Sequence, residues 1–149
     1  MKNNATQEII SVTPARLTSR NSEAFVVGCV DPRFANAVVE FITNRHPQQF
    51  DGFMNFPGGA KVLSEENQKQ QIIFEDLQKA VVLHNIQHIY LFVHADCAMY
   101  KEIENEQEQQ IQDLNTARTF LAQHFNNVQI HTMILTPTHN DKVEFQQVP

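Results

Sequence analysis

Two short, uninterrupted apolar segments constrain the fold of this chain more than any other feature. They are AFVVGCV at residues 24–30 and IYLFV at residues 89–93. Neither segment alternates apolar with polar residues, so each predicts a strand that is covered on both faces, as in a parallel sheet flanked by helices. Because open sheets of this kind bind ligands beyond the carboxyl ends of their strands, the residues that follow each segment are candidates for a functional site.

Segments with helical periodicity alternate with the predicted strands. We expect helices from Pro32 to about Arg45, from a cap at Ser64 to about His84, and over about residues 100–125. Further strands are expected at residues 53–57, 128–135 and 143–145. This alternation predicts an α/β domain with a mostly parallel central β-sheet flanked by helices. We therefore expect an N-terminal arm over residues 1–23 and a single domain over residues 24–149.

Composition and charge argue against several classes of function. The 149 residues are 42% hydrophobic and 19% charged, as in an ordinary folded domain. The net charge of -6 and the lack of dense Lys or Arg runs argue against a nucleic-acid partner. The N-terminus does not resemble a signal peptide, and no window approaches about 20 apolar residues, so we expect no membrane association and a cytoplasmic location. In that reducing compartment Cys29 and Cys97 are expected as free thiols or metal ligands rather than as a disulfide.

The two buried strands are each followed by residues that can bind a metal. The first ends in CVDPR at residues 29–33, and the second is followed by HADC at residues 94–97. If the strands are neighbours, the thiolates of Cys29 and Cys97 and the imidazole of His94 can converge at about 2.0 to 2.3 Å from a zinc ion. Structural zinc sites normally have four protein ligands, so three ligands with a free position are typical of a catalytic zinc.

Asp31 and Arg33 flank Cys29 and are candidates for a pair at the rim of this site. A bidentate pair of a carboxylate and a guanidinium could hold the aspartate away from the metal, where it could orient the attacking hydroxide. The alternative interpretation is an ordinary salt bridge at the start of the following helix.

The combined pattern resembles a known family. Cys-x-Asp-x-Arg at residues 29–33, followed about 60 residues later by His-x-x-Cys at residues 94–97, is similar to the motif of the β-carbonic anhydrases. The flanking stretches VGCVDPRF and LFVHADCAMY and the ending VQIHTMILTPTHNDKVEF are also similar. The resemblance covers about residues 24–147.

The resemblance implies a function and assigns residues to it. It implies reversible hydration of carbon dioxide to bicarbonate, a zinc cofactor, an α/β fold, and homodimers or higher homo-oligomers. Position by position, it implies that Cys29, His94 and Cys97 are the zinc ligands and that Asp31 and Arg33 form the catalytic dyad.

Two departures from the family pattern leave the substrate open. The chain has NFPG at residues 55–58, where the family usually has an Arg-Asn-Ala-Gly-like stretch, and Ala98 replaces a common glycine. The nearest alternative function is zinc-dependent hydrolysis of carbonyl sulfide or carbon disulfide, with Phe56 and Met99 as candidate apolar walls. An alternative of another class is a non-catalytic zinc-binding module with the same fold.

Several polar residues have simpler interpretations. We expect Asp96 to cap a turn or a helix, and the polar segment at residues 104–110 to be solvated. The remaining histidines show no metal-ligand spacing and are expected at the surface or at helix ends: His46, His84, His88, His124, His131 and His139.

Overall fold

The computed structural model describes residues 20–47 and 52–149, so most of the N-terminal arm expected over residues 1–23 lies outside the described residues. In the described part of the chain, five strands form one sheet: β1 (Ala24–Cys29), β2 (Phe53–Phe56), β3 (His88–His94), β4 (Gln129–Pro137) and β5 (Val143–Gln147). The helices between them are α1 (Pro32–Arg45), α2 (Gln68–His84), α3 (Glu106–Ala122) and the short 3-10 helices η1 (Gly59–Leu63) and η2 (Ala98–Tyr100).

The order of the strands in the sheet is β2-β1-β3-β4-β5. The first four strands run parallel, and β5 pairs with β4 as an antiparallel edge strand. Val27 of β1 lies opposite Leu91 of β3, so the carboxyl ends of these two neighbouring strands open at the same edge of the sheet. The predicted α/β class and the mostly parallel sheet are confirmed.

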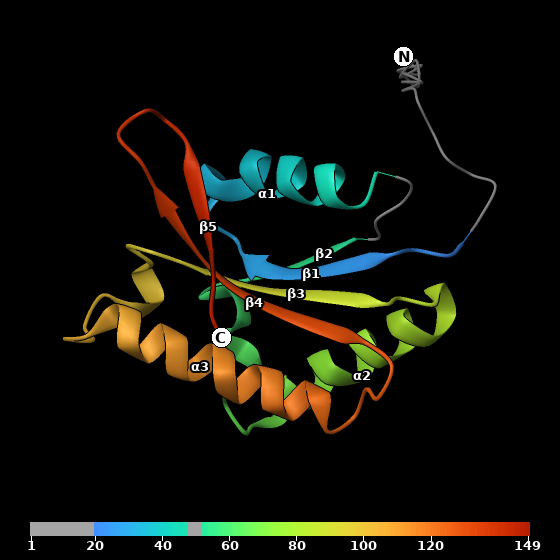
Figure 1. Cartoon of the computed structure of the whole chain (residues 1–149). Helices are drawn as coiled ribbons and strands as arrows, with labels where there is room; N and C mark the ends of the chain where they lie inside the picture. Colours follow the sequence, from blue (N-terminus) through green and yellow to red (C-terminus); the bar gives the residue numbers. More distant parts are fainter. Residues whose placement is uncertain (1–19, 48–51) are drawn as a thin grey trace, which may run out of the picture.

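Helices cover both faces of the sheet (Figure 1). Helix α1 lies on one face, and helices α2 and α3 lie on the other. The core under α1 includes Ala24, Val26, Phe34, Ile42, Phe92 and Leu135. The core under α2 and α3 includes Val27, Leu63, Leu77, Leu91, Leu114 and Leu121. Alternate residues of β1 and β3 therefore enter different cores, which is why these strands are apolar throughout.

Helix α1 has the bounds that the sequence predicts. Pro32 occupies its first turn, where a missing N–H costs nothing, and the side chain of Asp31 caps it by accepting a hydrogen bond from the backbone N–H of Arg33 at 3.0 Å. The helix ends at Arg45.

The predicted starts of the other two helices are wrong. Helix α2 is capped by Asn67, which accepts from the N–H of Gln70 at 2.9 Å, whereas Ser64 ends η1 and donates to the carbonyl of Lys61 at 2.7 Å. Helix α3 begins at Glu106 rather than near residue 100, because Tyr100 is buried in η2 instead of continuing a helix. Among the described residues, no helix combines the length and the apolar character needed to cross a bilayer.

Candidate metal centre

Three predicted ligands meet at the carboxyl edge of the sheet. Cys29 ends β1, His94 ends β3, and Cys97 lies in the turn that follows β3. Their ligand atoms all lie within 4.8 Å of one another, and no other group of three or more His, Cys, Asp or Glu side chains in the described residues meets this spacing. His94 and Cys97 are buried, Cys29 is half-buried, and both thiols are free. The convergence follows from the adjacency of β1 and β3.

In its neutral form, the imidazole of His94 presents an unprotonated nitrogen to this cluster. Its Nδ1 lies 2.9 Å from the carbonyl oxygen of Ala95, and since a carbonyl can only accept, Nδ1 carries the proton. In the neutral ring the Nε2 atom holds a lone pair; it is buried and has no hydrogen-bond partner among the described residues. The ring is held by stacking on Phe34, with ring centroids 4.4 Å apart. A buried acceptor without a donor is costly unless a cation satisfies it.

The chemistry of the three donors fits zinc. Two sulfurs and one imidazole nitrogen form a borderline-soft set, which suits this ion better than magnesium or calcium. Burial raises the pKa of the Cys29 thiol, but the adjacent imidazole of His94 and the backbone of Asp31 and Gly58 outweigh burial and lower the pKa to about 7. The pKa of Cys97 is raised, first by burial and also by its proximity to Cys29. A bound cation would favour both thiolates.

Asp31 and Arg33 form a bidentate pair beside the cluster. The Nη2 atom of Arg33 donates to Oδ2 of Asp31 at 2.7 Å, and Nε donates to both carboxylate oxygens at 3.0 Å. These hydrogen bonds lower the pKa of Asp31 to about 2. The Oδ2 atom lies 3.7 Å from Nε2 of His94, so the carboxylate borders the cluster while it remains paired with Arg33.

Asp96 is a second partner of Arg33. The Nη1 atom donates to Oδ2 of Asp96 at 3.2 Å, and Nη2 donates to the backbone carbonyl of Asp96 at 3.2 Å. Asp96 has a φ of 56°, in the left-handed region that non-glycine residues rarely adopt. Asp96 lies in the turn after β3, as expected, but it does not cap η2, whose N-cap is Cys97. Its contacts with Arg33 join the two chain segments that carry the predicted ligands.

Gly59 allows the chain after β2 to approach the site closely. A Cβ atom there would lie 2.2 Å from the carbonyl oxygen of Phe92 and 3.3 Å from the backbone nitrogen of Cys29, and the residue has a φ of +60°. Only glycine fits such a position. Gly58, before it, also has a positive φ, of +87°. This contact with the strand backbones is not predicted from the sequence.

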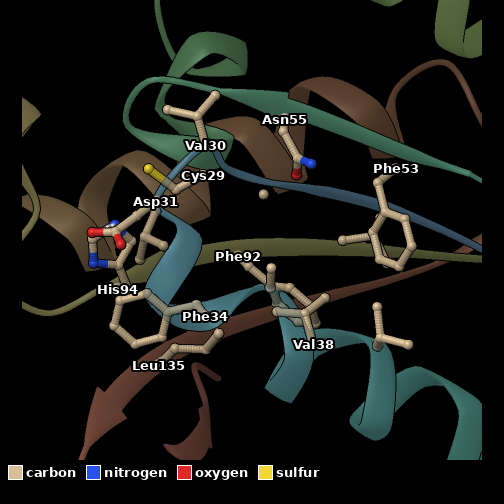
Figure 2. Close-up of a pocket in the computed structure, with 15 residues that line it drawn as sticks. Cys29, Val30, Asp31, Phe34, Val38, Phe53, Asn55, Phe92, His94 and Leu135 are labelled. Carbon is tan, nitrogen blue, oxygen red and sulfur yellow. Dashed lines mark ion pairs between the residues drawn. The ribbon is translucent and has the colours of Figure 1, made fainter.

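A cavity of about 120 Å³ leads to the cluster between α1 and the sheet. Figure 2 shows Cys29, Asp31 and His94 at one end of it and Phe53 at the other. Its apolar walls include Val26, Phe34, Val38, Phe53, Phe92 and Leu135. The walls expected from sequence are not among its lining residues, since Phe56 packs against the core under α2 and α3 and Met99 is 49% exposed.

Two residues near the centre were not predicted from the sequence. The expectation that residues 104–110 are solvated is wrong for Glu106, which is half-buried, and for Gln110, which is 1% exposed. Both contact the backbone of the predicted ligands. A helical projection indicates their position, because Glu106, Gln110 and Ala117 lie on the same side of α3 and Ala117 is in the core.

Three of the other histidines form a separate group at the opposite end of β3. His46 is buried, with Nε2 2.8 Å from the hydroxyl of Tyr90, and the centroid of its ring lies 4.9 Å from that of His88. His88 Nδ1 is 3.1 Å from Nε2 of His131. His46 lies at a helix end, one of the two expected locations, since it caps the C-terminus of α1, although it is buried rather than exposed. His88 and His131 are half-buried.

Comparisons with known proteins place the chain in a family. Residues 19–148 match the family described as "Putative carbonic anhydrase". The fold is similar to β-carbonic anhydrase isoform I of the protozoan Trichomonas vaginalis, with a TM-score of 0.62 and 13% identity over 91% of this chain and 87% of that chain. It is also similar to the carbonic anhydrase from Glaciozyma antarctica, with a TM-score of 0.60 and 12% identity over 89% and 85% of the two chains.

At these identities the similarity to solved structures concerns the fold alone. No curated protein gave a significant match to the sequence. The family match extends over nearly the whole chain and includes every residue of the Cys29, His94 and Cys97 cluster. The chain therefore belongs to the "Putative carbonic anhydrase" family and has a β-carbonic anhydrase-like fold.

Proposed function

We propose that this protein is a zinc-dependent carbonic anhydrase, which catalyses the reversible hydration of carbon dioxide to bicarbonate. The observation that carries the proposal is the buried Nε2 atom of His94, which has no hydrogen-bond partner among the described residues. The ligand atom of this imidazole lies within 4.8 Å of two free thiols, and Nε2 is 3.7 Å from the carboxylate of Asp31. The family match and the fold support the same reaction.

Cys29, His94 and Cys97 would hold the metal through their two sulfurs and through Nε2. Zinc in a three-ligand site supplies Lewis acidity, which lowers the pKa of water to about 7. The hydrogen bond from Nδ1 of His94 to Ala95 fixes the tautomer and the orientation of the ring, so the lone pair of Nε2 is available without rearrangement.

Asp31 would orient the water that attacks carbon dioxide. Because Arg33 binds both of its oxygens, the carboxylate is held in one position and stays ionised at neutral pH. An ionised carboxylate can accept a hydrogen bond from water and so direct a lone pair of the water oxygen toward the carbon. With both of its oxygens bound by Arg33, Asp31 would be held back from the metal as a fourth ligand.

The cavity suits a small uncharged substrate. Its walls are mainly aliphatic and aromatic, and carbon dioxide is a linear molecule without a net dipole or a proton to donate. Phe34 and Leu135 line the cavity close to His94 (Figure 2). Such apolar walls would disfavour bulk water at the centre. Bicarbonate is charged and would leave through the exposed side of the site.

We also propose that the active form is a homodimer or a higher homo-oligomer in a reducing, cytoplasmic compartment. Val30 and Val39, which line the cavity, are 53% and 43% exposed, and Met99 beside Gly58 is 49% exposed. A second copy of the chain would cover these apolar side chains. Sedimentation should show an oligomer, and an active monomer at all concentrations would contradict this part of the proposal.

The test of the function is stopped-flow hydration of carbon dioxide by zinc-loaded protein, with Cys97→Ser as the inactive comparison. We expect a rate well above the uncatalysed reaction for the parent and a loss of that rate in the variant. Hydrolysis of carbonyl sulfide without hydration would instead support the related hydrolase. Bound zinc with neither activity would support the non-catalytic module, and either result overturns the proposal.

A further inference from the structure

The first turns of α3 bind the backbone of two predicted metal ligands. The side-chain nitrogen of Gln110 donates a hydrogen bond to the carbonyl oxygen of His94 at 2.7 Å. The Oε1 atom of Glu106 accepts a hydrogen bond from the backbone N–H of Cys97 at 3.0 Å. The two contacts therefore connect α3 to the end of β3 and to the turn that follows it.

The two side chains are also joined to each other. The nitrogen of Gln110 donates its second hydrogen to Oε1 of Glu106 at 3.0 Å. The amide group therefore uses both of its hydrogens, one on His94 and one on Glu106. The Oε1 atom of Glu106 accepts from both Gln110 and Cys97. Since Gln110 is 1% exposed, water cannot replace its two hydrogen bonds without opening the structure.

The turn that these contacts hold is strained and carries two of the three ligands. Between His94 and Cys97, Asp96 adopts a left-handed φ of 56°. A non-glycine residue in this region is maintained only when surrounding contacts fix it. A third contact from α3 lies just beyond the turn, where the hydroxyl of Tyr100 donates to Oδ2 of Asp113 at 2.7 Å.

We propose that Gln110 and Glu106 are positioning residues of the metal centre, which set the separation of the His94 imidazole and the Cys97 thiolate by fixing the backbone at both ends of the turn. The inference rests on the proposed zinc site but not on the reaction. It assigns a role to α3, whose polar first turns are otherwise unexplained in a helix that packs on the core.

The test measures zinc affinity by competition with a chromophoric chelator, together with the absorption spectrum of the cobalt-substituted protein. Gln110→Met keeps the length of the side chain and its compatibility with a helix but removes both hydrogens. We expect its zinc affinity to fall about 10- to 100-fold, as is usual when a partner that orients a ligand is lost. The intensity of the cobalt–thiolate bands should also change, because the geometry of the donors changes.

Two substitutions separate positioning from other effects. Glu106→Gln keeps an oxygen that can accept from Cys97 and Gln110, so it should retain zinc affinity within about threefold, whereas Glu106→Ala should lose it as Gln110→Met does. Ile111→Val, beside Gln110 and packed against the core, should lower thermal stability while leaving zinc affinity and the cobalt spectrum unchanged.

Exposed Gln107→Ala serves as the neutral control on the same helix. The proposal is overturned if Gln110→Met and Glu106→Ala bind zinc as tightly as the parent, or if Ile111→Val weakens binding equally. A parent that takes up no zinc overturns both this inference and the proposed function. A parent that binds zinc but does not hydrate carbon dioxide overturns the function alone.

Discussion

Both carboxylate oxygens of Asp31 are bound by the guanidinium of Arg33, through three contacts of 2.7 to 3.0 Å. The same carboxylate caps α1 by accepting from the backbone N–H of Arg33. The structural and the functional interpretations of this pair are therefore compatible, because the helix start fixes both residues at the rim of the site.

Arg33→Ala should lower the rate of carbon dioxide hydration at least about tenfold at every pH from about 6 to about 9. The physical reason is that Asp31 loses its bidentate partner and is free to turn toward the metal, while all three ligands remain. Stopped-flow rates across this range check the prediction, and zinc content should equal that of the parent. Arg118→Ala, whose partners are Asn115 and Pro149, is the control. An unchanged rate and pH profile in Arg33→Ala would leave Arg33 a purely structural residue.

The histidine group at the opposite end of β3 predicts a loss of stability in acid. Burial, followed by the charges of His88, Arg45 and His46, lowers the pKa of His131 from the ordinary 6.5 to about 4. Between these values the unfolded chain binds a proton that the folded protein does not, so the stabilisation is complete above about pH 6.5 and is lost as the pH falls toward about 4.

Thermal unfolding at about pH 7.5 and about pH 5 measures this effect. The parent should lose several degrees of Tm between the two conditions, and His131→Gln should lose less, because glutamine does not titrate. His139→Gln, at an exposed position, should behave as the parent. Equal losses in the parent and in His131→Gln would show that the titration of His131 does not govern stability in this range.

The close approach of Gly59 predicts a severe effect of adding one methyl group. Gly59→Ala combines a left-handed backbone with an overlap against the carbonyl of Phe92, and we expect a loss of about 2–5 kcal/mol in the free energy of unfolding. Gly52→Ala is the matched control, since nothing lies within 4 Å of its added Cβ. Urea unfolding compares the two variants, and similar stabilities would contradict the described contact.

The sequence predicts the strands better than the helix starts. A segment such as 89–93 is apolar on both faces, so burial in a parallel sheet is the arrangement that removes all of it from water. Ser64 and Asn67 are both good capping residues, and local propensity does not separate them. Tertiary packing decides which of the two caps α2. Leu63 is fully buried in η1, and Ser64 directly after it is the C-cap of η1, so α2 begins after Asn67.

In the site, too, residues that belong to a local sequence pattern could be predicted, and residues that depend on tertiary contacts could not. The meeting of Cys29, His94 and Cys97 could be predicted. Cys29 and His94 end two recognisable strands, Cys97 lies in the turn after the second, and a parallel sheet brings strand ends to one edge. Gln110 and Gly59 could not be assigned, because their roles depend on atoms of other elements that approach them only in the folded chain. Polar residues near the start of a helix are ordinarily predicted to be exposed to solvent rather than to make buried contacts.

The metal content of protein purified without chelator is the decisive measurement for the proposed centre. Elemental analysis should find one zinc per chain in the parent, and Cys97→Ser should lose most of it, because a neutral hydroxyl is a poor zinc ligand compared with a thiolate. Gln107→Ala, at an exposed position, is the control and should carry as much zinc as the parent. A parent that carries no zinc and takes none up, or a Cys97→Ser variant that binds zinc as well as the parent, would contradict the proposed zinc centre.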